Sequence, residues 1–318
     1  MSELVHTPAS VGSAAGGWGI EARHRWDDVI TLNDRSQSPQ YRVRRIGGLR
    51  GLGDSEDNRE PRLGRDGEIP RQSYRRGKTV TYEKASIIAS SLAELRQAEE
   101  ALAAAFADVQ TEKRMVIAPH PDYASGSRFY WARSLSCEIA DEQEDRSRYR
   151  REFVVAVRMS DPRIFDSQPE SATTAAVGSS GGTSLPFTLP VELEASGSVS
   201  GAVVIENPGT APADPVIDVY GPVSDPVVEN ATYSVKLAFT NLVLTAEQFV
   251  RIDFGRPRRV LLMGEAGADY SSRLDVATSD WWAPTEPGLR PGEQMIRLSG
   301  ESLGDPARAE ISFNAAYW

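Results

Sequence analysis

The side chains with the strongest capacity for catalysis or metal binding are few in this sequence and lie far apart. Its three histidines are His6, His24 and His120. A metal site or a Ser-His-Asp relay needs several such groups close together. The sequence therefore indicates no metal site and no such relay.

One short segment combines two groups with chemical capacity. His120 lies between two prolines, and Asp122 follows the second of them. His120 has the chemistry of a general base, and Asp122 with a nearby acid has that of the carboxylate pair used in sugar hydrolysis. Flanking prolines favour a rigid loop instead, and nothing in the sequence brings two carboxylates to a suitable separation. We therefore expect no catalytic residue, and a hydrolase stays the third of three function classes.

Two tripeptides copy parts of nucleotide-enzyme motifs. Gly77-Lys78-Thr79 has the end of a phosphate-binding loop, but that motif needs a glycine five residues before Gly77, where the sequence has Gln72. The segment also leads into a strand pattern, so no helix dipole faces a phosphate. Asp253-Phe254-Gly255 copies a kinase tripeptide without a catalytic loop, and we expect it to be a strand that ends at a turn glycine. We expect no cofactor.

Two adjacent aromatic side chains, Trp281 and Trp282, could stack on a sugar ring. Adjacent residues of a strand point to opposite faces, so only one of them could be exposed. One core tryptophan and one under a loop or a subunit contact is the favoured interpretation. A carbohydrate-binding module stays the alternative function.

The composition is that of a globular protein. Of 318 residues, 40% are hydrophobic and 25% are charged. No apolar run approaches the roughly 20 residues of a membrane span, and the first residues have neither the basic cluster nor the apolar core of a secretory signal. We expect a chain that folds in a cytoplasm without inserting into a membrane.

A single cysteine, Cys137, excludes a disulfide within the chain and a cysteine-based zinc site. We expect it to be a small buried hydrophobe. The net charge of −10 is placed unevenly: residues 1–159 have 25 Lys plus Arg against 24 Asp plus Glu, and residues 160–318 have 10 against 21. Neither half has the charge of a nucleic-acid binder.

The first half predicts strands around one helix. Alternating apolar and polar residues indicate strands at 41–46, 78–83, 114–118, 128–140 and 149–159. Ser91 and Glu94 have the spacing of a capping box, and apolar residues then recur at three- and four-residue intervals, which predicts a helix at about 91–107. Its apolar stripe comprises Leu92, Leu95, Ala98, Leu102, Ala105 and Phe106.

A change of composition marks the boundary between two domains. Residues 171–183 are Ser, Thr, Ala, Val and Gly with no large apolar side chain. We expect a first domain at 1–166, a linker at 167–186 and a second domain at 187–318. In the second domain, short alternating strands and Pro-Gly turns predict an antiparallel β-sandwich, with 260–263 as a central strand covered on both faces.

The chain is arranged around residues 54–82. Residues 54–70 are so rich in charge, Gly and Pro that they predict a long ordered loop leading into a strand. The order Arg-x-Pro-Arg-x-Gly-Arg-Asp-Gly from Arg59, followed by Arg-Gly-Lys-Thr-Val-Thr from Arg76, resembles the distal tail proteins of long-tailed bacteriophages. Asp161-Pro162 and, in the second half, Asn207-Pro-Gly209, residues 215–222 and 226–230, Trp281-Trp282 and Pro287-Gly288 also follow the order found in that family.

The resemblance implies both a fold and a role. The fold is mainly β: an amino-terminal split β-barrel-like ring domain with one helix, and a carboxy-terminal galectin-like antiparallel β-sandwich. The implied role is structural, in a hexameric ring at the virion tail tip that joins the tail tube protein to the baseplate hub or other tail-tip proteins. DNA would pass through this ring without specific binding.

The organising stretch is locally basic, with 11 Lys plus Arg against 6 Asp plus Glu in residues 41–80. A channel for DNA should not bind phosphates, so we expect the basic loop to face away from it. Its arginines would then pair with carboxylates of the adjacent subunit or of the tube; the alternative is a solvated loop that contributes little. The interface candidates are Arg59, Arg62, Arg65, Arg75 and Arg76.

Overall fold

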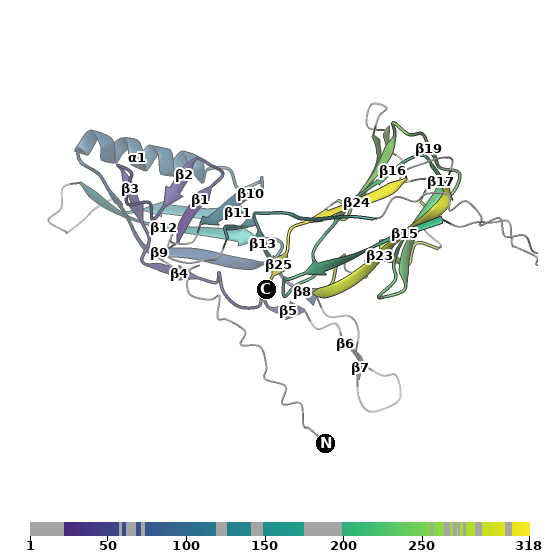
Figure 1. The fold of residues 1–318 in the computed structure, drawn as a ribbon. Coiled ribbons are helices and arrows are strands. Elements are labelled where there is room, and N and C mark those ends of the chain that lie inside the picture. The colour runs from purple at the N-terminus through teal and green to yellow at the C-terminus, as the bar shows by residue number, and fades with distance from the viewer. Residues whose placement is uncertain are drawn as a thin grey trace, which may run out of the picture. The chain divides into compact units, whose positions relative to one another are not determined.

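The computed structural model describes residues 22–56, 59–61, 68–70, 74–118, 126–140, 149–174, 199–255, 257–263, 268–269, 272, 274–275, 278–283, 288–302 and 307–318. Within these ranges the chain is mainly β and contains one α-helix, as the sequence predicts. It divides into two compact units, residues 1–167 with Trp318 and residues 168–317 (Figure 1).

The first unit is a closed barrel of seven strands, because β10 pairs with β11 and joins the two ends of the sheet. Every neighbouring pair in the barrel is antiparallel except β2 with β3. This confirms the predicted barrel-like domain with one helix. In barrel order the strands are β10 (Lys113–Ala118), β1 (Arg23–Trp26), β2 (Ile30–Leu32), β3 (Gln40–Arg42), β9 (Lys78–Ile88), β12 (Arg150–Met159) and β11 (Arg128–Ile139). Two short strands extend the sheet: β4 (Arg45–Gly47) on β9 and β13 (Ile164–Asp166) on β11.

The helix α1 (Leu92–Ala105) lies across the barrel and buries one face (Figure 1). The buried residues of its stripe are Leu95, Ala98, Leu102 and Ala105, and Phe106 at its end is also buried. Leu92 was predicted to join this stripe, but it is 48% exposed, because the first helical residue lies beyond the barrel core.

The amino-terminal cap of α1 adds two contacts to the predicted capping box. The Ser91 hydroxyl accepts from the Glu94 backbone N–H at 3.2 Å, as expected. The Glu94 carboxylate accepts from the Ser90 N–H and the Ser38 hydroxyl, both at 2.6 Å. The backbone N–H of Ser91 makes a smaller contribution to the lowered pKa of this carboxylate. Glu94 therefore fixes the loop that carries Ser38 to the start of the helix.

This contact predicts an acid-sensitive contribution to stability. Hydrogen bonds from Ser38 and then from Ser90 lower the pKa of Glu94 from 4.5 to about 2. A carboxyl group whose pKa is lower in the folded state stabilises the fold at a pH above its ordinary pKa of 4.5. This stabilisation is lost as the pH falls from about 4.5 to about 2. In Glu94→Gln the thermal midpoint should lie below that of the wild type at pH 6, and the two midpoints should converge by pH 2. Glu100→Gln controls for the lost helix charge; a gap for Glu94→Gln that is constant with pH would contradict the assignment.

The second unit consists of two antiparallel sheets, which confirms the predicted sandwich. Side chains that alternate along the strands are buried between them, such as Ile217, Val250 and Ile311 on one sheet and Val228 and Leu298 on the other. In order, the six-stranded sheet has β14 (Glu170–Thr173), β24 (Arg308–Phe313), β16 (Val216–Tyr220), β20 (Phe249–Asp253), β21 (Arg259–Met263) and β22 (Ala268–Asp269). The five-stranded sheet has β15 (Val199–Asn207), β23 (Gly292–Ser302), β17 (Val223–Asn230) and β18 (Val235–Ala238), with β19 (Val243–Leu244) also on β17. The last strand, β25 (Ala316–Tyr317), begins with a bridge to Ala211.

Three local expectations need correction. Residues 170–173 fall in the predicted linker, but they form β14, which needs no large apolar side chain because pairing with β24 satisfies its backbone. The strand at 260–263 is covered on one face only, with Val260 and Leu262 buried and the intervening residues half-buried, because its other face lies on the outside of the sandwich. Cys137 is half-buried rather than buried, and burial raises the pKa of its thiol.

Candidate functional site

The stretch at residues 54–77, which includes the predicted loop at 54–70, contains two pairs of short strands, and we call it the arm. Strand β5 (Ser55–Glu56) pairs with β8 (Tyr74–Arg75), and further out β6 (Arg59–Pro61) pairs with β7 (Glu68–Pro70) (Figure 1). The expectation that this stretch contains no regular element is therefore wrong. A two-stranded ribbon satisfies its backbone by pairing and needs no buried face, so charged residues and glycines do not prevent it.

The interface candidates are placed unequally by the structure. Arg62 and Arg65 lie outside the described residues, and only the backbone of Arg59 is described. Arg75 and Arg76 are exposed at the base of the arm. Residues 54–78 contain seven Lys plus Arg against six Asp plus Glu, so the basic excess found for residues 41–80 belongs to the segment before the arm.

Close backbone contacts fix the base of the arm to the barrel. A Cβ added to Gly77 would lie 2.2 Å from the Met159 carbonyl oxygen, and one added to Gly53 would lie 2.5 Å from the Arg76 carbonyl oxygen. Only glycine allows these approaches. The Arg76 N–H also donates to the Asp54 carbonyl at 2.7 Å. The arm therefore leaves the barrel from a tightly packed base.

We expect Gly77→Ala to disturb this base. The new methyl group has to move either β9 or the end of β12, because the atom it meets belongs to the backbone. The free energy of unfolding should fall by about 1 to 3 kcal/mol, measured by chemical denaturation. Gly126→Ala is the control, since a Cβ at Gly126 meets nothing within 4 Å; an equal effect at both positions would contradict the close-packed base.

The lysine of the phosphate-loop-like tripeptide Gly77-Lys78-Thr79 is buried. Lys78 is only 8% exposed, and its Nζ donates to the carbonyls of Leu49 at 2.9 Å and Gly51 at 3.3 Å. Burial lowers the pKa of Lys78, and the negative charge of Asp161 opposes this shift. Its ammonium group therefore holds the preceding loop and is not presented to a phosphate.

An ion pair next to this lysine was not identified from the sequence. Arg163 is 7% exposed, and its Nη2 lies 2.5 Å from Asp161 Oδ2, while its Nε donates to Oδ1 of the same carboxylate at 2.9 Å. Asp161-Pro162 was interpreted only as the end of the first domain. The Asp-x-Arg spacing, which lets Asp161 bind both the side chain and the backbone of Arg163, is the signal that could have revealed it.

Arg75 makes two contacts at the arm base. Its Nη1 donates to the Gly53 carbonyl at 3.4 Å, and its guanidinium carbon lies 5.1 Å from the centre of the Trp318 ring. Such a contact between an arginine and an aromatic ring orients an exposed guanidinium group at modest cost. Arg75 is thus held in place but still exposed to a partner.

The first unit contains a buried polar chain that carries no catalytic arrangement. The Tyr82 hydroxyl lies 3.2 Å from Nδ1 of His24 and 2.6 Å from the Tyr130 hydroxyl, and all three side chains are fully buried. Burial raises the pKa of both tyrosines, so their hydroxyls stay protonated. His120 and Asp122 lie outside the described residues.

Only one of the paired tryptophans, Trp282, is partly exposed. They lie on a short 3-10 helix, η2 (Asp280–Trp282), and not on a strand. Trp281 is fully buried, in agreement with the favoured interpretation of one core tryptophan, so it does not present its ring to a sugar. Trp282 is half-buried under the Arg258 guanidinium, 5.8 Å from its ring centre, while Arg258 Nη1 donates to the Trp282 carbonyl at 2.9 Å. Asp253-Phe254-Gly255 ends β20 in a turn, as predicted, with the Gly255 N–H donating to Asp253 Oδ1.

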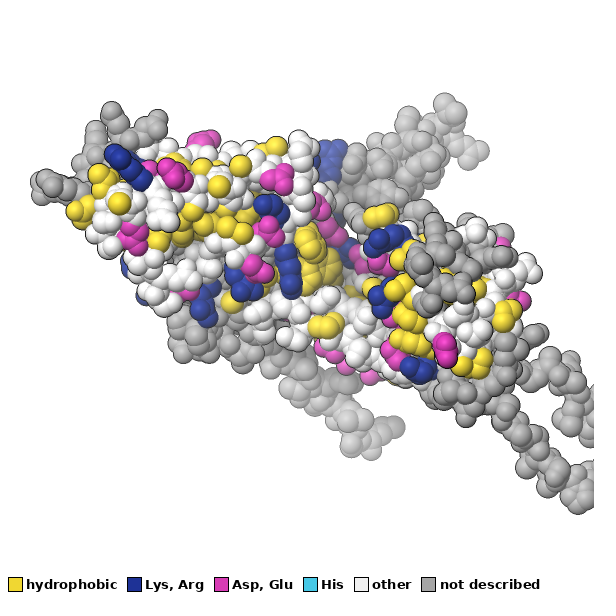
Figure 2. Space-filling model, turned by 90° about the horizontal axis from the view of Figure 1, so that it is seen from above, with side chains coloured by type: hydrophobic (Ala, Val, Ile, Leu, Met, Phe, Trp, Pro, Cys, Tyr) yellow, Lys and Arg dark blue, Asp and Glu magenta, His cyan; other side chains and the backbone are white. Residues whose placement is uncertain are grey.

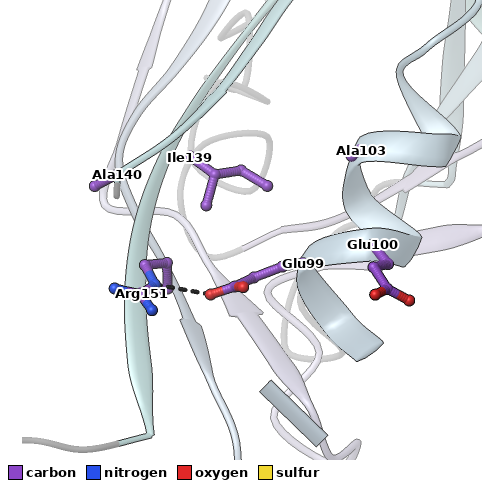
Figure 3. Close-up of a pocket in the computed structure, with 6 residues that line it drawn as sticks. All are labelled: Glu99, Glu100, Ala103, Ile139, Ala140 and Arg151. Carbon is purple, nitrogen blue, oxygen red and sulfur yellow. Dashed lines mark hydrogen bonds and ion pairs between the residues drawn. The ribbon is translucent and has the colours of Figure 1, made fainter. Parts of the chain in front are cut away.

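A hollow of about 330 Å³ lies between α1 and the ends of β11 and β12. Glu99 reaches from the helix to Arg151 at 2.7 Å, whereas Glu100 points away from that pair (Figure 3). Hydrolysis by a carboxylate pair needs two carboxyl groups on either side of the bond that is cleaved. Both Glu99 and Glu100 line this hollow, but Glu99 is paired with Arg151 and Glu100 points away from that pair. Within the described ranges, no group of three or more His, Cys, Asp or Glu side chains could hold a metal.

In the view of Figure 2, the described surface has no large patch of one charge sign, and apolar side chains lie among both cations and anions. In the part of the chain that the structure describes, no helix is long and apolar enough to cross a membrane.

Comparison with solved structures identifies the fold. The chain is similar to the Dit protein of phage SPP1, described as a hub of the adsorption apparatus of phages that infect Gram-positive bacteria. The TM-score is 0.60 at 14% identity, over 93% of this chain and 99% of that one. A chain of the phage P2 baseplate in its activated conformation with calcium gives a TM-score of 0.48 at 9% identity, over 92% and 97% of the two chains. No family model and no curated protein matches the sequence.

Proposed function

We propose that this chain, which has the fold of a phage distal tail protein along nearly its whole length, is a structural subunit of a phage tail tip. Copies of it form a ring that joins the tail tube to the baseplate and lets DNA pass. The observation that carries this proposal is the match to SPP1 Dit, which extends through both units. In this role the chain binds proteins on either side of the ring and catalyses no reaction.

The charge distribution supports a passage for DNA. The first unit has 26 Lys plus Arg against 26 Asp plus Glu in residues 1–167, and the second has 9 against 19 in residues 168–317. A wall without net positive charge does not accumulate salt-sensitive contacts to phosphates. Neither unit therefore slows DNA by general electrostatic attraction.

Negative-stain imaging of the purified full chain tests the ring directly. We expect closed particles with a central hole and a mass near six copies. Immunogold labelling of virions should place the protein at the tail tip, after assembly in the host cytoplasm. Particles without a hole at every concentration, or labelling on the capsid, would contradict the proposal.

The arm arginines are expected to contribute to this assembly. Arg62→Glu with Arg65→Glu should lower the fraction of subunits in rings, because arginines that pair with carboxylates of a neighbour become repulsive. The thermal midpoint of the isolated subunit should stay unchanged. Arg42→Glu with Arg44→Glu makes the same charge change at exposed positions before the arm. Equal ring fractions in both double variants would contradict a contact between the arm and its neighbour. Binding of duplex DNA through Arg62 and Arg65 would place the arm in the channel.

A further inference from the structure

One face of the barrel presents two arginines that have no carboxylate partner among the described residues, beside exposed apolar side chains. Arg133 on β11 and Arg158 on β12 lie directly opposite each other across the two strands. Neither has a carboxylate partner among the described residues; Arg158 donates only to the Thr79 hydroxyl, at 3.2 Å. On the same face of β11, Trp131 is 44% exposed, and Leu135, at the adjoining bulge, is 47% exposed. We call these four residues the arginine face.

The outer face of the five-stranded sheet presents the opposite charge in the same arrangement. Glu206 on β15 and Glu293 on β23 lie directly opposite each other, both exposed and without a cationic partner among the described residues. The neighbouring pair on that face is Val204 opposite Met295, which are 58% and 40% exposed. We call these four residues the glutamate face.

Each face is unfavourable in an isolated chain. Like charges directly opposite each other on a sheet destabilise it. Other charges of the two sheets avoid this arrangement: Arg45 pairs with Glu83 at 3.3 Å on the barrel, and Arg297 pairs with Glu229 at 3.6 Å on the second unit. The two unpaired sets lie beside the apolar side chains that exclude water in a contact. Contact between the two faces would both neutralise the like charges and bury the exposed apolar side chains.

A ring requires two different surfaces on every subunit. In a head-to-tail contact one surface of each copy binds a different surface of the next, and the rotation closes the ring. The arginine face and the glutamate face supply such a pair, with two cations against two anions and aromatic and aliphatic side chains against a valine and a methionine. Tryptophan and arginine are also the side chains that most often dominate protein contacts.

We propose that the arginine face of one copy binds the glutamate face of the next copy in the assembled ring. Arg133 and Arg158 pair with Glu206 and Glu293, and Trp131 and Leu135 pack on Val204 and Met295. This inference rests on the proposed ring and names the surfaces that close it.

Charge exchange between two variants of the full chain tests the contact. Arg133→Glu with Arg158→Glu has acidic groups on both faces, and Glu206→Arg with Glu293→Arg has basic groups on both. Each variant alone should need a concentration at least about 30-fold higher than the wild type for half-assembly. Mixed in equal amounts they should assemble together, because each face then meets its opposite in an alternating ring, which an even number of copies allows.

Matched measurements separate this contact from folding and from the proposed function. Arg35→Glu with Arg96→Glu changes the charge of two other exposed arginines of the first unit equally and should assemble as the wild type does. Thermal midpoints show that each variant folds. Folded variants that form rings alone, or that form no rings when mixed, would overturn the contact. Rings of the wild-type protein would still support the proposed function in that case. A wild type that stays monomeric at its highest soluble concentration would overturn the contact too, and immunogold labelling would then decide the tail-tip location by itself. Mixed assemblies that bind DNA through Arg133 and Arg158 would assign the arginine face to nucleic acid.

Discussion

Trp26→Ala should lower the free energy of unfolding by about 3 to 5 kcal/mol, the cost of removing a buried aromatic side chain. Trp26 is fully buried in the first unit and stacks on Phe106, with 4.9 Å between ring centres. Its Nε1–H donates to the Ala105 carbonyl at 3.0 Å, at the end of α1. The substitution therefore leaves a cavity and removes the partner of a helix carbonyl at the same point.

Chemical denaturation of Trp26→Ala and Trp26→Phe measures these two contributions. The phenylalanine variant keeps most of the ring contact and loses the hydrogen bond, so it should cost about 1 to 3 kcal/mol. Domains of ordinary stability have only about 5 to 15 kcal/mol in total, so the alanine variant should also unfold at a much lower temperature. A loss below that of the phenylalanine variant would show that α1 is not held by this side chain.

Asp161→Ala should destabilise the first unit by about 3 to 5 kcal/mol, because breaking a buried ion pair leaves a charge without compensation. Arg163 is 7% exposed and would lose its carboxylate partner. The buried Lys78 would also lose the negative charge that favours its protonated form. One substitution thus leaves two cations uncompensated at the base of the arm.

Hydrogen exchange gives this prediction a local measurement. The amides of residues 49–53 and 76–80 should exchange faster in Asp161→Ala, since Lys78 holds the Leu49 and Gly51 carbonyls. Asp161→Ala with Arg163→Met removes both charges and should recover most of the lost stability. Glu229→Ala breaks a more exposed pair and should cost less than about 1 kcal/mol. Equal costs at Asp161 and Glu229 would contradict a buried pair at the arm base.

The sequence predicted the elements whose signal is local. The helix at 92–105 combined an apolar stripe with Ser91 at its cap, and both lie within one segment. The alternation of Phe153, Val155 and Val157 predicted a strand with one buried face, and all three side chains are buried. A period in the sequence indicates burial because a strand turns every second side chain, and a helix every third or fourth, toward the same core.

The arm and the paired tryptophans had no such signal. The strands of the arm are stabilised by pairing with each other, so they leave no apolar period in residues 55–75. Trp281 and Trp282 are placed by η2 and by Arg258, which lies 24 residues before Trp282. A strand could not be distinguished from a 3-10 turn there from two adjacent aromatic residues.

By itself, the sequence determined the mainly β composition, the helix, the alternating strands and the uneven charge of the two halves, because propensity, period and charge are properties of neighbouring residues. Only the tertiary structure decided which distant residues meet. It closed β10 on β11, brought Lys78 beside Asp161, and set Arg133 opposite Arg158 and Glu206 opposite Glu293. The register between two strands depends on how all the strands of the sheet pack around one core, and no single strand carries that information.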